Sequence, residues 1–240
     1  MSDYFIFDNV SSATYGVYVF PTDTMVQAPA RQYTEHAIPG RNGTLLIDTK
    51  RFENVHIEYG VAIPEGSYAN LAELRNFLAS RVGYKKLTDT FDTDHYYMAV
   101  YKEDFVPRMD WHGMDISTAK LTFERKPQRF LVIGDNTVPF TTNGSITNPT
   151  RFPSKPLLKI ITSTSSASTV GIGSTNIVIA RQGTIYIDCD IGRAYNGATP
   201  LDSYVTLNTI DYPTLAPGTN SISLGTGISR VEITPRWWTL

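Results

Sequence analysis

The sequence contains a single cysteine, Cys189. One cysteine cannot form a disulfide within the chain, and a chain without disulfides suits the reducing cytosol. No stretch approaches the roughly 20 apolar residues that are needed to span a bilayer. Residues 1–4 contain no basic segment followed by an apolar run. We therefore expect neither a signal peptide nor a membrane span.

Charge is also scarce and nearly balanced. Charged residues make up 18% of the chain, and the formal net charge is -2. Proteins that coat nucleic acid or bind a membrane surface use clustered Lys and Arg to replace counterions or to meet anionic lipid. The balance therefore argues against both of these partner classes.

The usual catalytic motifs are missing. The chain has no Gly-x-Ser-x-Gly elbow, no phosphate-binding Gly-x-x-x-x-Gly-Lys loop, no dinucleotide fingerprint and no His-Glu-x-x-His. Its four histidines are scattered, and His95 is the one that follows three aspartates, within residues 89–95. A calcium loop would also need a turn glycine and a closing glutamate at set positions, and neither is present. We expect these carboxylates to cap a hairpin loop, and we predict no metal, cofactor or catalytic residue.

Aromatic residues are plentiful instead, with 14 Tyr and 11 Phe, and they favour strands. The stretch Thr122–Ile133 separates two patterns, because the chain beyond it is rich in Ser, Thr, Gly and Asn and poor in Glu and Lys. The sequence therefore predicts a mainly β protein with two domains. Residues 1–138 form the first domain, and residues 139–240 form the second.

The first domain is predicted to combine a β-sheet with one helix. Residues 39–43 contain an Asn-Gly pair that suits a tight turn between strands at 33–38 and 44–48. Residues 55–63 alternate strictly between apolar and other side chains, which is typical of a half-buried strand. After them, apolar residues recur at helical spacing and end before Gly83. These residues are Leu71, Leu74, Phe77, Leu78 and Val82.

The second domain has the sequence pattern of a β-sandwich, with short strands separated by turns and no evident helix. Residues 139–156 are loop-rich and are interpreted as a linker or as a strand that leads into this domain. The strands are expected at 157–162, 177–180, 184–189, 193–195, 205–207, 221–224 and 231–234.

Three cations surround Pro127 at the domain boundary: Arg125, Lys126 and Arg129. They are candidates for a phosphate-binding or partner-binding patch, and the alternatives are a solvated connector or a donor of salt bridges between subunits. We favour contacts between domains or subunits. Because proline lacks a backbone N–H, we also expect the strand not to continue unchanged through Pro127.

Two further groups lie in the second domain. Cys189 shares an apolar face with Ile185, Ile187 and Ile191 and is expected in the core. Asp188 and Asp190 share the opposite face, where a paired-carboxylate hydrolase site is geometrically conceivable. Trp237 and Trp238 are adjacent, so at most one should enter the core. The other should meet an interface or a sugar, and we favour the interface.

Several stretches together resemble the distal tail protein (Dit) family of siphophages, the baseplate hub of long-tailed phages. The resemblance covers nearly the whole chain. Its carriers are residues 38–45 with their Pro-Gly-Arg-Asn-Gly turn, the strand and helix within 55–82, Leu87–Asp92, the Lys-Pro-Gln core of 124–131, Tyr186–Cys189 with Ala194–Tyr195, Pro213 with the Pro217-Gly218 turn and Asn220, and residues 235–238.

The resemblance implies an N-terminal β domain (split-barrel-like) with one α-helix, which assembles into a hexameric ring at the end of the tail tube. It implies a C-terminal galectin-like β-sandwich outside that ring, without the long inserted arm that holds receptor-binding proteins in some family members. The implied partners are other copies of the chain, tail-tube and tape-measure proteins, a Tal-like tip protein and receptor-binding proteins, with DNA passing only through the lumen. The implied location is the virion tail tip, after assembly in the host cytoplasm.

Two alternatives to a structural ring protein stay open. A carbohydrate-binding module would present Trp237 or Trp238 to a cell-wall glycan. A glycoside hydrolase would use Asp188 and Asp190.

Overall fold

The computed structural model describes residues 3–22, 27–64, 68–104, 106 and 116–240. The protein is mainly β, as its composition predicted, and it divides into two compact units. Unit 1 is Met1–Arg129 together with Leu240, and unit 2 is Phe130–Thr239. The division follows Arg129, whereas the sequence placed the boundary after residue 138.

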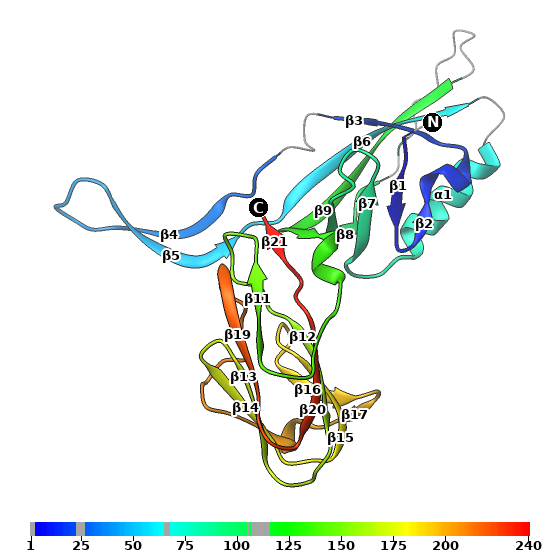
Figure 1. The fold of residues 1–240 in the computed structure, drawn as a ribbon. Coiled ribbons are helices and arrows are strands. Elements are labelled where there is room, and N and C mark those ends of the chain that lie inside the picture. The colour runs from blue at the N-terminus through cyan, green and yellow to red at the C-terminus, as the bar shows by residue number, and fades with distance from the viewer. Residues whose placement is uncertain (1–2, 23–26, 65–67, 105, 107–115) are drawn as a thin grey trace. The chain divides into compact units, whose positions relative to one another are not determined.

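Unit 1 is built on a sheet with the strand order β2-β1-β7-β8-β9-β6-β3 (Figure 1). A 3-10 helix, η1 (Ser12–Tyr15), follows β2 and ends at Gly16 in the left-handed conformation. The strands are β1 (Phe5–Phe7), β2 (Val10–Ser11), β3 (Tyr18–Pro21), β6 (Val55–Pro64), β7 (Lys85–Asp89), β8 (His95–Tyr101) and β9 (Ile116–Leu131).

The helix α1 (Tyr68–Ser80) packs on this sheet because three leucines recur on one side of it, at positions 71, 74 and 78. The alternation predicted for β6 is confirmed, since Val55, Ile57, Tyr59 and Val61 are all buried. Val82 lies past the end of α1 and is 87% exposed, so its predicted place on the apolar helix face is wrong. The core formed by the helix and the sheet also contains Phe5, Phe7, Leu87, Leu121 and Phe123.

Strands β4 (Arg31–Ala37) and β5 (Thr44–Phe52) form a separate two-stranded sheet, which we call the arm (residues 31–52). The predicted hairpin is confirmed. Its turn places Gly40 and Gly43 at φ of 77° and 84°, a region that favours glycine, and the N–H of Arg41 donates to the carbonyl of Ile38 at 3.1 Å.

Strand β9 runs through Pro127 without interruption, so the predicted break at this proline is wrong. The pairing with β6 explains this result. Val55 is the first residue of β6 and lies opposite Arg125, so Pro127 falls past the end of β6. On the β6 side, therefore, Pro127 removes no hydrogen bond from the ladder.

Unit 2 is a sandwich of two antiparallel sheets, with the orders β10-β20-β12-β15-β16-β17 and β11-β19-β13-β14-β18. Apolar side chains from both sheets meet in one core, which includes Leu158, Ile185, Ile222 and Val231. Two strands, β10 and β11, form at or within the stretch that the sequence marked as loop-rich.

The bounds in unit 2 are β10 (Val138–Phe140), β11 (Gly144–Asn148), β12 (Leu157–Thr162), β13 (Ser168–Ile172), β14 (Thr175–Ile179), β15 (Gly183–Asp188), β16 (Arg193–Asn196), β17 (Thr199–Pro200), β18 (Val205–Leu207), β19 (Gly218–Leu224), β20 (Ile228–Thr234) and β21 (Trp238–Thr239). Two 3-10 helices, η3 (Val132–Asp135) and η4 (Asp202–Tyr204), complete the unit.

Candidate functional site

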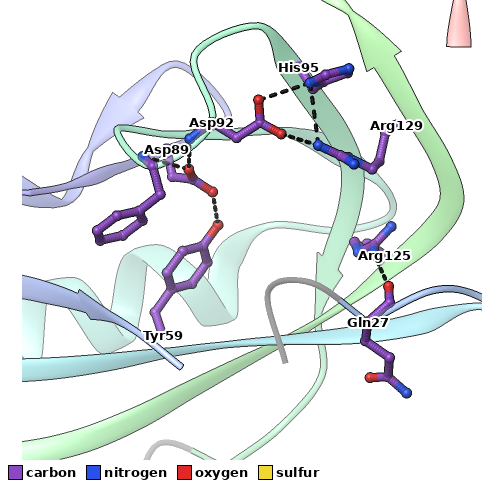
Figure 2. A network of polar contacts seen from close by, with 8 residues as sticks. Gln27, Tyr59, Asp89, Asp92, His95, Arg125 and Arg129 are labelled. Carbon is purple, nitrogen blue, oxygen red and sulfur yellow. Dashed lines mark hydrogen bonds and ion pairs between the residues drawn. The ribbon is translucent and has the colours of Figure 1, made fainter. Parts of the chain in front are cut away.

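The loop between β7 and β8 is held by a buried carboxylate, that of Asp89 (Figure 2). Its Oδ1 accepts the backbone N–H groups of Phe91 and Asp92, each at 2.9 Å, and its Oδ2 accepts the hydroxyl of Tyr59 at 2.7 Å. Burial and the neighbouring carboxylate raise the pKa of Tyr59 well above its ordinary value. Tyr59 therefore stays a neutral donor that ties the loop to β6.

A second carboxylate, that of Asp92, joins this loop to the end of β9. His95 Nδ1 lies 2.8 Å from Asp92 Oδ1, and Arg129 Nη2 donates to Asp92 Oδ2 (Figure 2). Burial would raise the pKa of Asp92, but the hydrogen bonds from His95 and Arg129 outweigh that effect and lower it. The loop carboxylates thus cap the hairpin, as the sequence predicted.

No group of three or more His, Cys, Asp or Glu is arranged to hold a metal within the part of the chain that the structure describes. His112 lies outside that part.

Arg125 lies inside unit 1, with 1% of its surface exposed. Its Nη2 donates to the backbone carbonyl of Gln27 at 2.9 Å, and its guanidinium lies 4.7 Å from the centre of the Tyr97 ring. Burial lowers the pKa of Arg125. Among the described residues, Nε and Nη1 of this side chain have no hydrogen-bond partner.

The other two cations of the predicted patch have their own contacts. Lys126 Nζ lies 5.2 Å from the centre of the Tyr84 ring, and Arg129 pairs with Asp92. The side chain of Arg129 is 33% exposed. The structure therefore separates the three cations into one buried side chain, Arg125, and two that reach the surface.

The arm carries apolar side chains on both of its faces. Leu45 and Ile47 lie opposite His36 and Thr34 on one face, and Leu46 lies opposite Glu35 on the other. These three apolar side chains are 46%, 47% and 55% exposed, in the order Leu45, Ile47, Leu46. Sequence reasoning identified the hairpin but missed this surface. The available signal was three consecutive apolar residues in a strand without a second sheet to cover it.

The two adjacent tryptophans differ in environment. Trp237 is buried in the core of unit 2. The Trp238 ring stacks on Phe152 with centroids 4.5 Å apart, and its Nε1 donates to the carbonyl of Pro153 at 3.0 Å. Neither side chain therefore offers the open ring and free N–H that a sugar-binding tryptophan would use.

The paired-carboxylate hypothesis does not fit the geometry of Asp188. Both of its oxygens accept hydrogen bonds from Arg236, at 2.7 and 2.9 Å. Burial would raise the pKa of Asp188, but the bonds from Arg236 outweigh it and lower the pKa, which is the wrong direction for a general acid. Neighbouring Cys189 is buried, and burial raises its pKa to about 12, so its thiol is not a nucleophile at neutral pH.

No protein-family model and no curated protein matches this sequence. Among solved structures, the chain is similar to the crystal structure of the Dit protein (gp 19.1) of phage SPP1, described as a paradigm of the hub adsorption apparatus in phages that infect Gram-positive bacteria. The TM-score is 0.72 at 15% sequence identity, and the match covers 100% of both chains.

This chain has the Dit fold. The resemblance that the sequence motifs indicated is thus confirmed at the level of the fold, and it extends through unit 1 and unit 2 alike. No helix among the described residues combines the length and apolar character that a membrane crossing requires.

Proposed function

We propose that this chain is a non-catalytic structural protein of a phage tail, a distal tail protein whose copies form a hexameric ring at the tip of the tail tube. The full-length Dit fold supports the role in the tail. The arm carries the proposal of self-assembly, because its apolar side chains are exposed on both faces. An isolated two-stranded hairpin is at best marginally stable in water, and exposed apolar patches mark interaction sites.

We expect a neighbouring copy of the chain to cover the apolar side chains on both faces of the arm. If the arm of each subunit packs on the next subunit, the contact is head-to-tail, and such contacts close into rings when the rotation between subunits permits. Each contact would bury on the order of 1,000 Å² or more to be stable. A near-neutral net charge of -2 suits a lumen through which DNA passes without binding.

The remaining partners follow from the same proposed position in the virion. The ring would join the tail tube and tape-measure proteins on one side and a Tal-like tip protein on the other, with receptor-binding proteins as a further partner. Lys126, Arg129 and Trp238 reach the surface and stay predicted contacts to such neighbours. Arg125 and Trp237 are buried within their own units.

Substitution of the arm tests the assembly. Leu46→Asp should raise the dissociation constant of the assembled state at least tenfold, because it places a charge in the proposed interface between subunits, where the leucine is buried. The folded monomer should be unaffected, since substitutions at exposed positions change stability by less than about 0.5 kcal/mol. Analytical ultracentrifugation over a range of concentrations measures the effect.

Val82→Asp is the matched control, because Val82 is an apolar residue of unit 1 that is 87% exposed outside the arm. It should leave assembly unchanged. Equal assembly of the wild type and the Leu46→Asp variant would remove the arm from the interface.

A further inference from the structure

Arg125 is the largest fully buried side chain among the described residues. Burying a guanidinium is costly unless its charge is compensated. Within the described chain it forms no ion pair with a carboxylate, and two of its nitrogens lack hydrogen-bond partners. Its burial therefore needs a reason other than a salt bridge within the core.

The contacts of Arg125 lie where the arm joins the sheet of unit 1. On the side where the chain enters the arm, the carbonyl of Gln27 accepts a hydrogen bond from Arg125 Nη2 at 2.9 Å. On the side where the chain leaves the arm, Val55 opens β6 directly opposite Arg125. One residue of β9 thus meets both chain segments that flank the arm, and Figure 2 shows its hydrogen bond to Gln27.

The base of the arm is closed by contacts of its own. The N–H of Glu53 donates to the carbonyl of Ala30 at 2.9 Å, and Arg31 pairs with Asp48. The guanidinium of Arg31 also lies 5.4 Å from the centre of the Phe52 ring. These contacts hold the two strands of the arm to each other, but none of them links the arm to the sheet. The hydrogen bond from Arg125 to Gln27 links the entry side of the arm to β9, and Tyr97 supports the guanidinium from β8 at 4.7 Å. On the exit side, Asn54 Nδ2 donates to Glu124 Oε1 of β9 at 2.6 Å, but this second link lies among exposed side chains, whereas Arg125 is buried.

We propose that Arg125 is a positioning residue that fixes the orientation of the arm on the sheet of unit 1. This role rests on the proposed function, because a fixed arm serves a purpose only if a neighbouring subunit binds it. A fixed arm has the orientation for binding before the neighbouring subunit arrives. An ordered arm loses less conformational entropy when it binds, and this raises the affinity of assembly. Arg125→Met, which keeps the apolar stem and removes the donor, should weaken assembly about tenfold or more, the factor that one hydrogen bond from a charged donor supplies.

The orientation of the arm can be measured directly in a monomer. Spin labels at Arg41→Cys in the arm turn and at Lys120→Cys in β9 report the distance from the arm to the sheet by double electron–electron resonance. The native cysteine is removed by Cys189→Ala, and Leu46→Asp keeps the chain monomeric. With Arg125 present, the distance distribution should be narrow. In Arg125→Met it should broaden and shift, and in Arg125→Lys it should broaden less, because lysine keeps a charged donor without the planar guanidinium.

Lys126→Met is the matched control, since it removes the adjacent cation from the surface of the same strand and should leave the distribution narrow. Amide exchange in β8 reports whether the sheet of unit 1 remains folded in each variant. An unchanged distribution in Arg125→Met overturns the proposal. Loss of amide protection in β8 in both Arg125 variants also overturns it, because Arg125 would then stabilise the sheet as a whole.

This experiment separates the proposal from the assumption of a ring. A wild-type chain that stays monomeric contradicts the proposed assembly, yet the distance distribution still shows whether Arg125 fixes the arm. A wild-type chain that forms rings, with an arm that is equally ordered in the absence of Arg125, contradicts only the positioning role.

Discussion

Asp188 and Arg236 form the best-defined ion pair of unit 2. The two nitrogens of the Arg236 guanidinium face the two carboxylate oxygens, and the Asp188 side chain is only 12% exposed. The N–H of Asp190 also donates to Asp188 Oδ1 at 3.0 Å. Arg236 has a φ of 55°, a conformation that non-glycine residues rarely adopt. The pair therefore holds the chain after β20 in a strained turn beside the end of β15.

We predict that Asp188→Asn lowers the free energy of unfolding of unit 2 by roughly 1–3 kcal/mol at neutral pH, the range for hydrogen bonds to charged groups. The folded-state pKa of Asp188 lies below its usual value, so its contribution is fully present above pH of about 4 and is lost as the pH falls through the folded-state pKa. Urea unfolding at neutral and acid pH should show the difference between wild type and variant shrinking in acid.

Asp190→Asn serves as the control for this prediction. Asp190 is 56% exposed and lies 3.4 Å from Lys155, and exposed pairs of this kind contribute little. A loss of stability in Asp190→Asn as large as that in Asp188→Asn would contradict the special role given to the pair with Arg236.

These residues show what local sequence can and cannot predict. The burial of Cys189 followed from its apolar neighbours in the strand, and the adjacency of the two tryptophans predicted that at most one of them enters the core. Ile191, assigned to the same face as Cys189, is 64% exposed because β15 ends at Asp188. The partner of Asp188 could not be predicted, since Arg236 lies 48 positions away and is brought close only by the fold.

At the scale of elements, the edge of the unit 1 sheet depends on a glycine. Phe20 of β3 lies opposite Gly60 of β6, and its ring covers the position where a side chain would stand. A Cβ at Gly60 would lie 1.9 Å from the Phe20 ring, far closer than atoms in contact allow. Because Gly60 has no side chain, the Phe20 ring can lie over the backbone of β6 where it pairs with the edge strand β3.

We predict that Gly60→Ala lowers the free energy of unfolding of unit 1 by about 1 kcal/mol, because the Phe20 ring, which is 44% exposed, must turn away from its place over β6. Phe20→Ala should relieve this clash, so the double variant should be more stable than the sum of the two single effects implies. A double-mutant cycle measured by urea unfolding gives the coupling. Strictly additive effects would contradict the proposed packing of Phe20 on Gly60.

Elements with strong local signals were predictable, and elements defined by distant partners were not. The arm turn, the alternation of β6 and the bounds of β12 and β18 all follow from periodicity and turn residues. Strand β9 continues past Pro127 because β6 has already ended there, a fact that the local sequence does not contain. The burial of Arg125 likewise depends on Gln27 and Tyr97, which come from other parts of unit 1.

At the scale of the whole molecule, two separately packed units leave one element without a cover. Unit 1 has its core between α1 and the sheet, and unit 2 has its core between two sheets. The arm contributes to neither core, and its leucines and isoleucine face solvent. In the ring that we propose, a second copy of the chain covers this surface.

In the assembly that we propose, copies of this chain form a closed ring through unit 1. Native mass spectrometry of the purified wild-type chain at tens of micromolar, combined with negative-stain electron microscopy, tests it most directly. We expect a mass of six chains, or of two such rings together, and images of a ring with a central opening. A chain that is strictly monomeric by mass and shows no ring in the images would contradict the account.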